Sequence, residues 1–218
     1  MMLRILGIDP GTRVAGYGIV DLFPDGRIVG VCAGVWRFDG ELPLAARLAS
    51  LATELVRIVE LYSPHTVCVE QAFVAQNIRS ALFLGHARGV VLALAHQRGV
   101  VVHELSPTAV KKAVLAHGRS SKESVARALS QILKVSFENL PFDASDALAV
   151  AYAHALREKR AHTEGVPLPS GGAKERQPKA RAGGSRWAAA LPQKKGPRRG
   201  SKQGFEIFLA DRRKPGES

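Results

Sequence analysis

The sequence predicts an α/β fold in which one mixed sheet of five strands carries helices on both faces. Three observations predict it. Short apolar runs that stop at turn residues alternate with longer segments whose apolar residues recur at helical spacing. The first three runs follow one another with no helix between them, which indicates an antiparallel meander. Helices separate the later runs, which indicates parallel crossover units.

Three of the expected strands come first in the chain, and residues that favour turns separate them. Pro10-Gly11 closes the first apolar run, and Pro24-Asp25-Gly26 separates the second run from the third. The fourth run, TVCVE, is β-rich and ends in a carboxylate. The five expected strands are 3–9, 16–20, 28–36, 66–70 and 100–104.

The helices are predicted from periodicity. Segment 42–61 is amphipathic, with apolar residues at Leu44, Leu48, Leu51, Leu55, Ile58 and Val59. Further helices are expected at 75–98, 107–116, 122–133 and 144–160. The resulting order, βββαβα and then a fifth strand followed by helices, is the layout of the ribonuclease-H-like fold, which is the fold class predicted for residues 1–160.

Composition changes after residue 160. Segment 161–204 is rich in Gly, Pro, Ala, Ser, Lys and Arg and has no periodicity, so it is predicted to be disordered. The whole basic tail, 161–218, is expected to lack fixed structure. The alternative is that 185–191 and 205–209 are short docking segments.

The net charge of +12 lies almost entirely in the C-terminal part of the chain, from Arg157 onward. Up to Leu156 there are 15 Lys and Arg against 13 Asp and Glu, whereas from Arg157 onward there are 16 against 6. A basic tail favours a polyanionic partner such as nucleic acid. It is equally compatible with simple solubility, so the charge says little about the domain.

Other compositional features narrow the class of protein. No secretory signal is recognised, and no apolar run is expected to reach the roughly 20 residues of a membrane span, so no membrane partner is predicted. Two cysteines, Cys32 and Cys68, are too few for a disulfide framework or a zinc site, which favours a reducing cytoplasm. The seven histidines show no metal-ligand spacing.

Four carboxylates are distinguished by their positions. Asp9 ends the first strand and Glu70 ends the fourth, and the ends of neighbouring strands lie side by side. Asp143 and Asp146 are three residues apart at the start of the last helix, which places them on one helix face. Taken singly, Asp9 is explained as a turn residue, Asp143 as a helix N-cap and Asp146 as a first-turn acid. Glu70, directly after a buried strand, has no such explanation.

Taken together, the four acids predict a metal site. Gathered carboxylates repel one another unless a cation neutralises them. Mg²⁺ takes oxygen ligands from a few carboxylates and from substrate phosphates. Two such ions roughly 3.5–4 Å apart activate a water and stabilise the leaving oxygen of a phosphodiester. We therefore expect a nuclease with one or two Mg²⁺ per subunit, for which Mn²⁺ is a substitute.

Four segments then resemble a known family in the same order along the chain. They are LGIDPGTRVAGYGIV (6–20), VEQAF (69–73), SALFLGHARGVV (80–91) and DASDALAVAYAH (143–154). They resemble the RuvC-type crossover-junction endodeoxyribonucleases, the bacterial Holliday-junction resolvases, over roughly residues 1–158. The resemblance implies that the four acids are the catalytic, metal-binding tetrad.

The resemblance also implies roles for three other residues. Lys111 and Lys122 match basic residues expected to hold the scissile strand or stabilise transition-state charge. Phe73 matches an aromatic residue that stacks on junction bases. From the sequence alone, the lysines would be interpreted as a solvated helix face and Phe73 as core packing.

The implied activity is paired, symmetric hydrolysis of a four-way DNA junction, leaving 5′-phosphates, in DNA recombination and repair. Implied partners are branched DNA, a second copy of the chain and the branch-migration helicase complex. Helix 75–98, with Gly85 and Gly89, would pack either on the second copy or on its own sheet. The tail has no counterpart in ordinary family members.

Three other interpretations remain. A ribonuclease-H-like nuclease that processes ribosomal RNA precursors would share the first motif but lack the LGHARG segment. An ATP-binding phosphotransferase using the DPGT turn would need a second phosphate motif in a longer chain. A non-catalytic DNA-binding protein would leave the four acids unexplained, because acids near phosphates weaken binding.

Overall fold

The computed structural model describes residues 1–71, 78–114, 122–133, 140–164 and 205–209. For 122–126, 164 and 205–209 only the backbone is described. Within this part of the chain the strands form one sheet in the order β5-β4-β1-β2-β3-β6. The strands are β1 (Leu3–Asp9), β2 (Val14–Leu22), β3 (Ile28–Arg37), β4 (Thr66–Glu70), β5 (Val101–Leu105) and β6 (Phe205–Leu209).

The pairing directions follow the predicted connections. β1, β2 and β3 form an antiparallel meander, and β1, β4 and β5 run parallel. Parallel neighbours need a crossover, and helices supply it. The helices are α1 (Leu44–Tyr62), α2 (Ile78–Gln97), α3 (Pro107–Val114), α4 (Lys122–Leu133) and α5 (Phe142–Glu164). The predicted mixed sheet with helices on both faces is confirmed.

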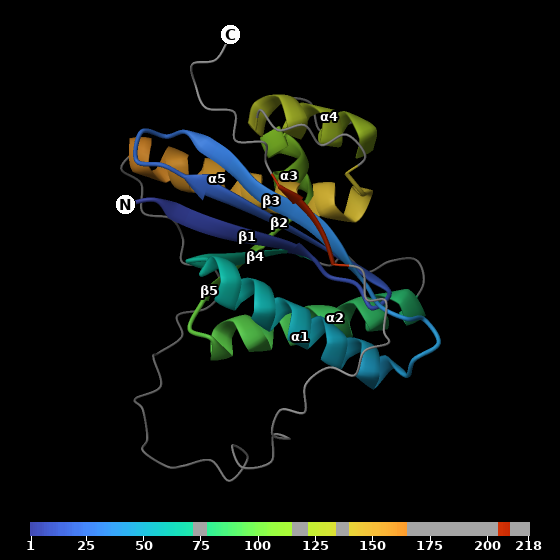
Figure 1. The fold of residues 1–218 in the computed structure, drawn as a ribbon. Coiled ribbons are helices and arrows are strands. Elements are labelled where there is room, and N and C mark those ends of the chain that lie inside the picture. Colours follow the sequence, from blue (N-terminus) through green and yellow to red (C-terminus); the bar gives the residue numbers. More distant parts are fainter. Residues whose placement is uncertain (72–77, 115–121, 134–139, 165–204, 210–218) are drawn as a thin grey trace, which may run out of the picture.

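Helices cover the two faces of the sheet in separate layers. Figure 1 shows α1 and α2 on one face and α3, α4 and α5 on the other. Side chains of each strand alternate between the two layers. In β1, Ile5 joins the core formed with α3, α4 and α5, whereas Leu6 and Ile8 join the core formed with α1 and α2.

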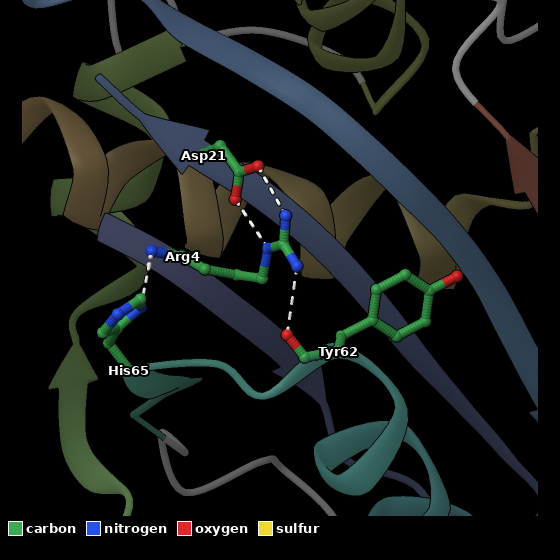
Figure 2. Close-up of polar contacts among 4 residues, drawn as sticks. All are labelled: Arg4, Asp21, Tyr62 and His65. Carbon is green, nitrogen blue, oxygen red and sulfur yellow. Dashed lines mark hydrogen bonds and ion pairs between the residues drawn. The ribbon is translucent and has the colours of Figure 1, made fainter. Parts of the chain in front are cut away.

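Ion pairing fixes the start of β1 to its surroundings. The Arg4 guanidinium donates two hydrogen bonds of 2.8 Å to the Asp21 carboxylate on β2 and one of 3.1 Å to the Tyr62 carbonyl at the end of α1 (Figure 2). The Arg4 backbone N–H donates to His65 Nδ1 at 3.0 Å. The hydrogen bonds to Asp21 raise the pKa of Arg4. Arg4 therefore ties together two strands, the end of α1 and the loop that leads into β4.

One part of the tail forms a strand, in keeping with the alternative of a short docking segment at 205–209. Phe205–Leu209 forms β6, which pairs antiparallel with β3 from Cys32 to Trp36. α5 also runs to Glu164, beyond the expected end at 160. The edge of a sheet offers unpaired backbone groups to any β-prone segment that reaches it, and FEIFL is such a segment. The tail composition alone gives no sign of that distant partner.

The expectation that no apolar segment reaches membrane-spanning length is wrong. Among the described helices, α2 is long enough and apolar enough to cross a membrane, judged by length and composition only. A single helix of this kind is weak evidence for a membrane span, because core helices of soluble proteins can have the same length and composition. One side of α2 packs on the rest of the domain through Ala87, Val91 and Ala95, and Arg88 pairs with Glu104 of β5.

Candidate active site

Strand alternation directs Asp9 and Glu70 to the same face of the sheet. In β1, Ile5 lies in the core on the α5 side, and Gly7 lies directly under α5, so Asp9 two residues later faces the same way. In β4, Cys68 belongs to that core, which directs Glu70 to it as well. The two strands run parallel with Ile8 opposite Val69. Asp9 and Glu70, the next residues along, are therefore neighbours at the carboxyl ends of adjacent strands.

Glycines let α5 come close to this corner. A Cβ at Gly16 would lie 1.9 Å from the Asp143 carbonyl oxygen, and one at Gly7 would lie 2.1 Å from the Ala147 carbonyl oxygen. A Cβ at Gly18 would lie 2.7 Å from the Leu148 Cα. No side chain fits between the strands and the helix at these positions. Gly7, Gly16 and Gly18, named together the glycine path, form the surface on which α5 lies.

The glycine path brings the helical acids to the strand acids. Gly16, beneath the Asp143 carbonyl, is the β2 partner of Asp9 in the antiparallel register. Asp146 lies one turn further along α5, next to Ala147, which covers Gly7. All four carboxylate residues are half-buried, so the corner is lined by protein and still open to solvent. Three elements thus supply one acidic corner.

Asp143 is not the N-cap of the last helix. α5 begins at Phe142, so Asp143 lies inside the first turn. The first turn carries the positive end of the helix dipole, which favours an acid there. The Ser145 hydroxyl donates to the Phe142 carbonyl at 2.8 Å, and the Ser145 N–H donates to the Pro141 carbonyl at 3.0 Å. The capping alternative for Asp143 is therefore wrong.

The structure says less about the three residues predicted to bind DNA, Lys111, Lys122 and Phe73. Lys111 lies on the exposed side of α3, whose Val110 and Val114 pack inward. Lys122 is the first residue of α4, but its side chain is not described. Phe73 lies outside the described residues. The roles of these three residues remain predictions.

The glycine path is the part of the site that the sequence reasoning missed. Its signal was present: LGID and GYG place glycines inside strands, where glycine weakens the strand and marks a close approach of another backbone. Gly7, Gly16 and Gly18 have no side chain that could take part in chemistry. Their contribution is to the position of Asp143 and Asp146.

The chain matches one known protein family, which identifies its fold and its activity. The family model described as crossover junction endodeoxyribonuclease RuvC matches residues 5–154. The chain belongs to this family. The match spans the whole acidic corner and the glycine path, so the predicted resemblance is confirmed. Membership makes the chain an endodeoxyribonuclease, a hydrolase that serves DNA recombination and repair.

Relatives in the RuvC family cover most of the chain. The crossover junction endodeoxyribonuclease RuvC of Myxococcus xanthus is 46% identical over 176 residues, which are 80% of this chain and 90% of the relative. The one from Magnetococcus marinus is 37% identical over 165 residues, 76% of this chain and 90% of the relative.

Solved structures agree with the family assignment. RuvC of Thermus thermophilus in complex with a Holliday junction substrate superposes with a TM-score of 0.68 and 29% identity, covering 73% of this chain and 96% of that one. The yeast mitochondrial Holliday junction resolvase Ydc2, 18% identical with a TM-score of 0.54, shares the fold and covers 75% of this chain and 84% of that one. The ribonuclease-H-like fold class is confirmed.

Proposed function

We propose that this chain resolves four-way DNA junctions by phosphodiester hydrolysis at Asp9, Glu70, Asp143 and Asp146. The observation that carries the proposal is the close contact of α5 with the glycine path, which gathers acids from three elements at one open corner. The RuvC family supplies the reaction class. A junction has two symmetry-related strands to cut, and paired nicks in them separate the two duplexes.

The donor set of the acidic corner fits Mg²⁺. It consists only of carboxylates, the oxygen ligands that hard divalent cations take, and Mn²⁺ is a natural substitute. When bound, one or two such ions polarise the scissile phosphate and lower the pKa of water. The carboxylates of Asp9, Glu70, Asp143 and Asp146 would hold these cations. The half-buried corner leaves the four carboxylates accessible to a phosphodiester.

Cleavage of defined DNA tests the assignment. The purified full chain, with Mg²⁺, is expected to nick a radiolabelled four-way junction at symmetric positions, leaving 5′-phosphates, and to leave linear duplex and RNA intact. Asp9→Asn and Asp146→Asn keep side-chain size while removing a charge, and we expect each to lower cleavage by at least about 100-fold. Junction binding measured without divalent ions should persist in both variants.

A matched control is Asp25→Asn, an exposed turn acid whose pKa Arg27 lowers through a side-chain hydrogen bond. It should cleave like the parent. Equal cutting of duplex or RNA would favour a different ribonuclease-H-like nuclease. Full activity in Asp9→Asn would contradict the assignment of the site.

We further propose that α2 joins two copies of the chain into a homodimer. The side of α2 that faces away from the sheet carries exposed apolar side chains: Ile78 is 74% exposed and Leu82 is 60% exposed. No described atom lies within 4 Å of a Cβ built at Gly85 or Gly89, so these glycines do not pack on their own sheet. Of the two predicted roles for this face, contact with a second copy is therefore favoured. A dimer would set two acidic corners on the two strands of one junction.

Hydrodynamic mass tests the dimer. Gly89→Arg places a charge in the proposed interface without a clash inside one chain. We expect the parent to sediment as a dimer and Gly89→Arg as a folded monomer, with paired cleavage replaced by uncoupled nicks. The control Ala45→Arg adds the same charge to an exposed position on α1. A dimeric Gly89→Arg variant, or a monomeric parent, would contradict the proposal.

The remaining assignments extend this function. Lys111 and Lys122 would hold the scissile strand, and Phe73 would stack on junction bases, as the family resemblance implies. The same resemblance proposes the branch-migration helicase complex as a partner and a bacterial cytoplasm as the location. Glutamine at both lysines should weaken junction cleavage more than it weakens dimer formation.

A further inference from the structure

A second group of ligand-type side chains lies between β5 and α5, away from the acidic corner. It consists of His103 on β5 with His154 and Glu158 on α5, and the ligand atoms of the three residues lie within 4.8 Å of one another. His154 Nε2 is 3.2 Å from Glu158 Oε1, and the two imidazole rings lie 4.4 Å apart. His154 is eight residues beyond Asp146, which is about 12 Å of helical rise. The group is therefore separate from the four carboxylates.

The polar atoms of this group are not all satisfied by the rest of the protein. Among the described residues, neither His103 Nδ1 nor His154 Nδ1 has a hydrogen-bond partner, although both atoms are buried. A buried polar atom without a partner costs about 1–3 kcal/mol, so native proteins seldom keep two side by side. His154 itself is 1% exposed. The pair of histidines thus lacks a partner that a bound ion would supply.

Helix and strand geometry present the three side chains together. His154 and Glu158 are four residues apart and share one face of α5. His103 pairs in register with Cys68 of β4, and alternation directs it toward that face. One ligand atom from each of the three residues lies within 4.8 Å of the others, so small side-chain rotations would bring them to the roughly 3.4 Å expected between ligand atoms at tetrahedral Zn²⁺, for which Zn–N bonds are about 2.0–2.1 Å.

We propose that His103, His154 and Glu158 bind one Zn²⁺, with water in the fourth position. Two imidazoles and one carboxylate form a ligand set that suits zinc better than magnesium. Burial lowers the pKa of both histidines, so each ring is neutral near pH 7 and has a free lone pair. The ion would tie β5 to α5, and α5 carries Asp143 and Asp146. Its role would be to hold that helix in place.

Zinc binding is best measured in the full chain carrying Asp9→Asn and Glu70→Gln, so that the acidic corner does not contribute. We expect one Zn²⁺ per chain by isothermal titration with Zn²⁺ alone, and a rise in melting temperature of about 5 °C or more at saturation. The ring nitrogens of His103 and His154 should shift in nitrogen-correlated NMR spectra. A purely structural pair of histidines would give none of these signals.

Two variants identify the ligands. Glu158→Gln keeps size and lies at the half-buried edge of the group, so it should fold and bind Zn²⁺ at least about 10-fold more weakly, with the thermal shift lost. His103→Gln provides an independent test should one variant fold poorly. His162→Gln, an exposed histidine on the same helix, is the matched control and should bind like the parent.

Two outcomes would overturn the proposal. One is the absence of stoichiometric Zn²⁺ binding in the Asp9→Asn/Glu70→Gln background. The other is binding that survives unchanged in Glu158→Gln and His103→Gln but disappears in His162→Gln, which would indicate a surface site.

Discussion

At the scale of single residues, the stability of the fold depends on ion pairs in which one member is buried. Arg4 on β1 and Asp21 on β2 form an ion pair joined by two hydrogen bonds, and Asp21 is only 6% exposed. Removing one member of such a pair leaves an uncompensated buried charge, whereas replacing both by apolar groups is often neutral. The pair also reaches α1 through the Tyr62 carbonyl, so it organises the approach to β4.

Arg4→Met should lower the free energy of unfolding by about 3 kcal/mol, because it leaves the Asp21 carboxylate buried and unpaired. The double variant Arg4→Met/Asp21→Leu should recover most of that loss. Urea denaturation of both measures the effect. Arg27→Met, which removes an ion pair with Asp25 on the surface, is the control and should cost much less. An equal loss in the single and double variants would show that the pair is not what stabilises this region.

At the scale of elements, the acidic corner depends on where one helix lies. Asp143 and Asp146 lie near Asp9 only because the backbone of α5 lies directly against β1 and β2. Only glycine permits that approach, because any Cβ on the path would meet the helix backbone. The position of Asp143 and Asp146 is thus set by residues that have no side chains.

Gly16→Ala tests this dependence. A Cβ 1.9 Å from the Asp143 carbonyl oxygen forces α5 to move. We expect the free energy of unfolding to fall by about 3 kcal/mol. Junction cleavage at a temperature where the variant is folded should fall by roughly 100-fold, because a displacement of about 1 Å in an active site has that effect.

Gly40→Ala is the control for this substitution, because its Cβ would lie 3.5 Å from the Arg13 guanidinium, an ordinary contact. It should retain both stability and activity. Normal cleavage by folded Gly16→Ala would show that α5 can move without disturbing the site.

At the scale of the whole molecule, catalysis and net charge lie in different parts of the chain. From residue 165 onward there are 13 Lys and Arg against 4 Asp and Glu. β6 ties this basic region back to the sheet at β3, on the edge opposite β5. The positive charge of the tail is expected to add to phosphate neutralisation.

A chain ending at Glu164 should still cleave junctions at low salt, because the acidic corner is intact. Its junction affinity should depend less steeply on salt concentration, since fewer phosphates are neutralised. Ile207→Pro separates charge from docking: it removes the N–H donor of the β6 residue opposite Gly34 and keeps every charge. That variant should keep the salt dependence of the full chain. An unchanged salt dependence after truncation would show that the tail does not contact DNA.

The sequence by itself determined the elements and the chemistry. Periodicity is a local property, so it predicted the strands of the meander, the amphipathic α1 and the placement of Asp9 and Glu70 at strand ends. The ordered motifs from LGIDPG to DASDALAV predicted the family. Each of these depends on residues close together in the chain, which share a face or a turn whatever the rest of the fold does.

Only the tertiary structure decided how distant elements meet. The glycine path under α5, the pairing of β6 with β3 and the meeting of His103 with His154 and Glu158 join residues 40 or more positions apart or from separate elements. A local pattern such as a glycine inside a strand can mark a close approach, but it does not name the partner, because the partner depends on which faces remain uncovered once the sheet and its helices have packed. The four acids proposed to carry the activity could therefore be named from the sequence, whereas the packing of α5 on the glycine path could not.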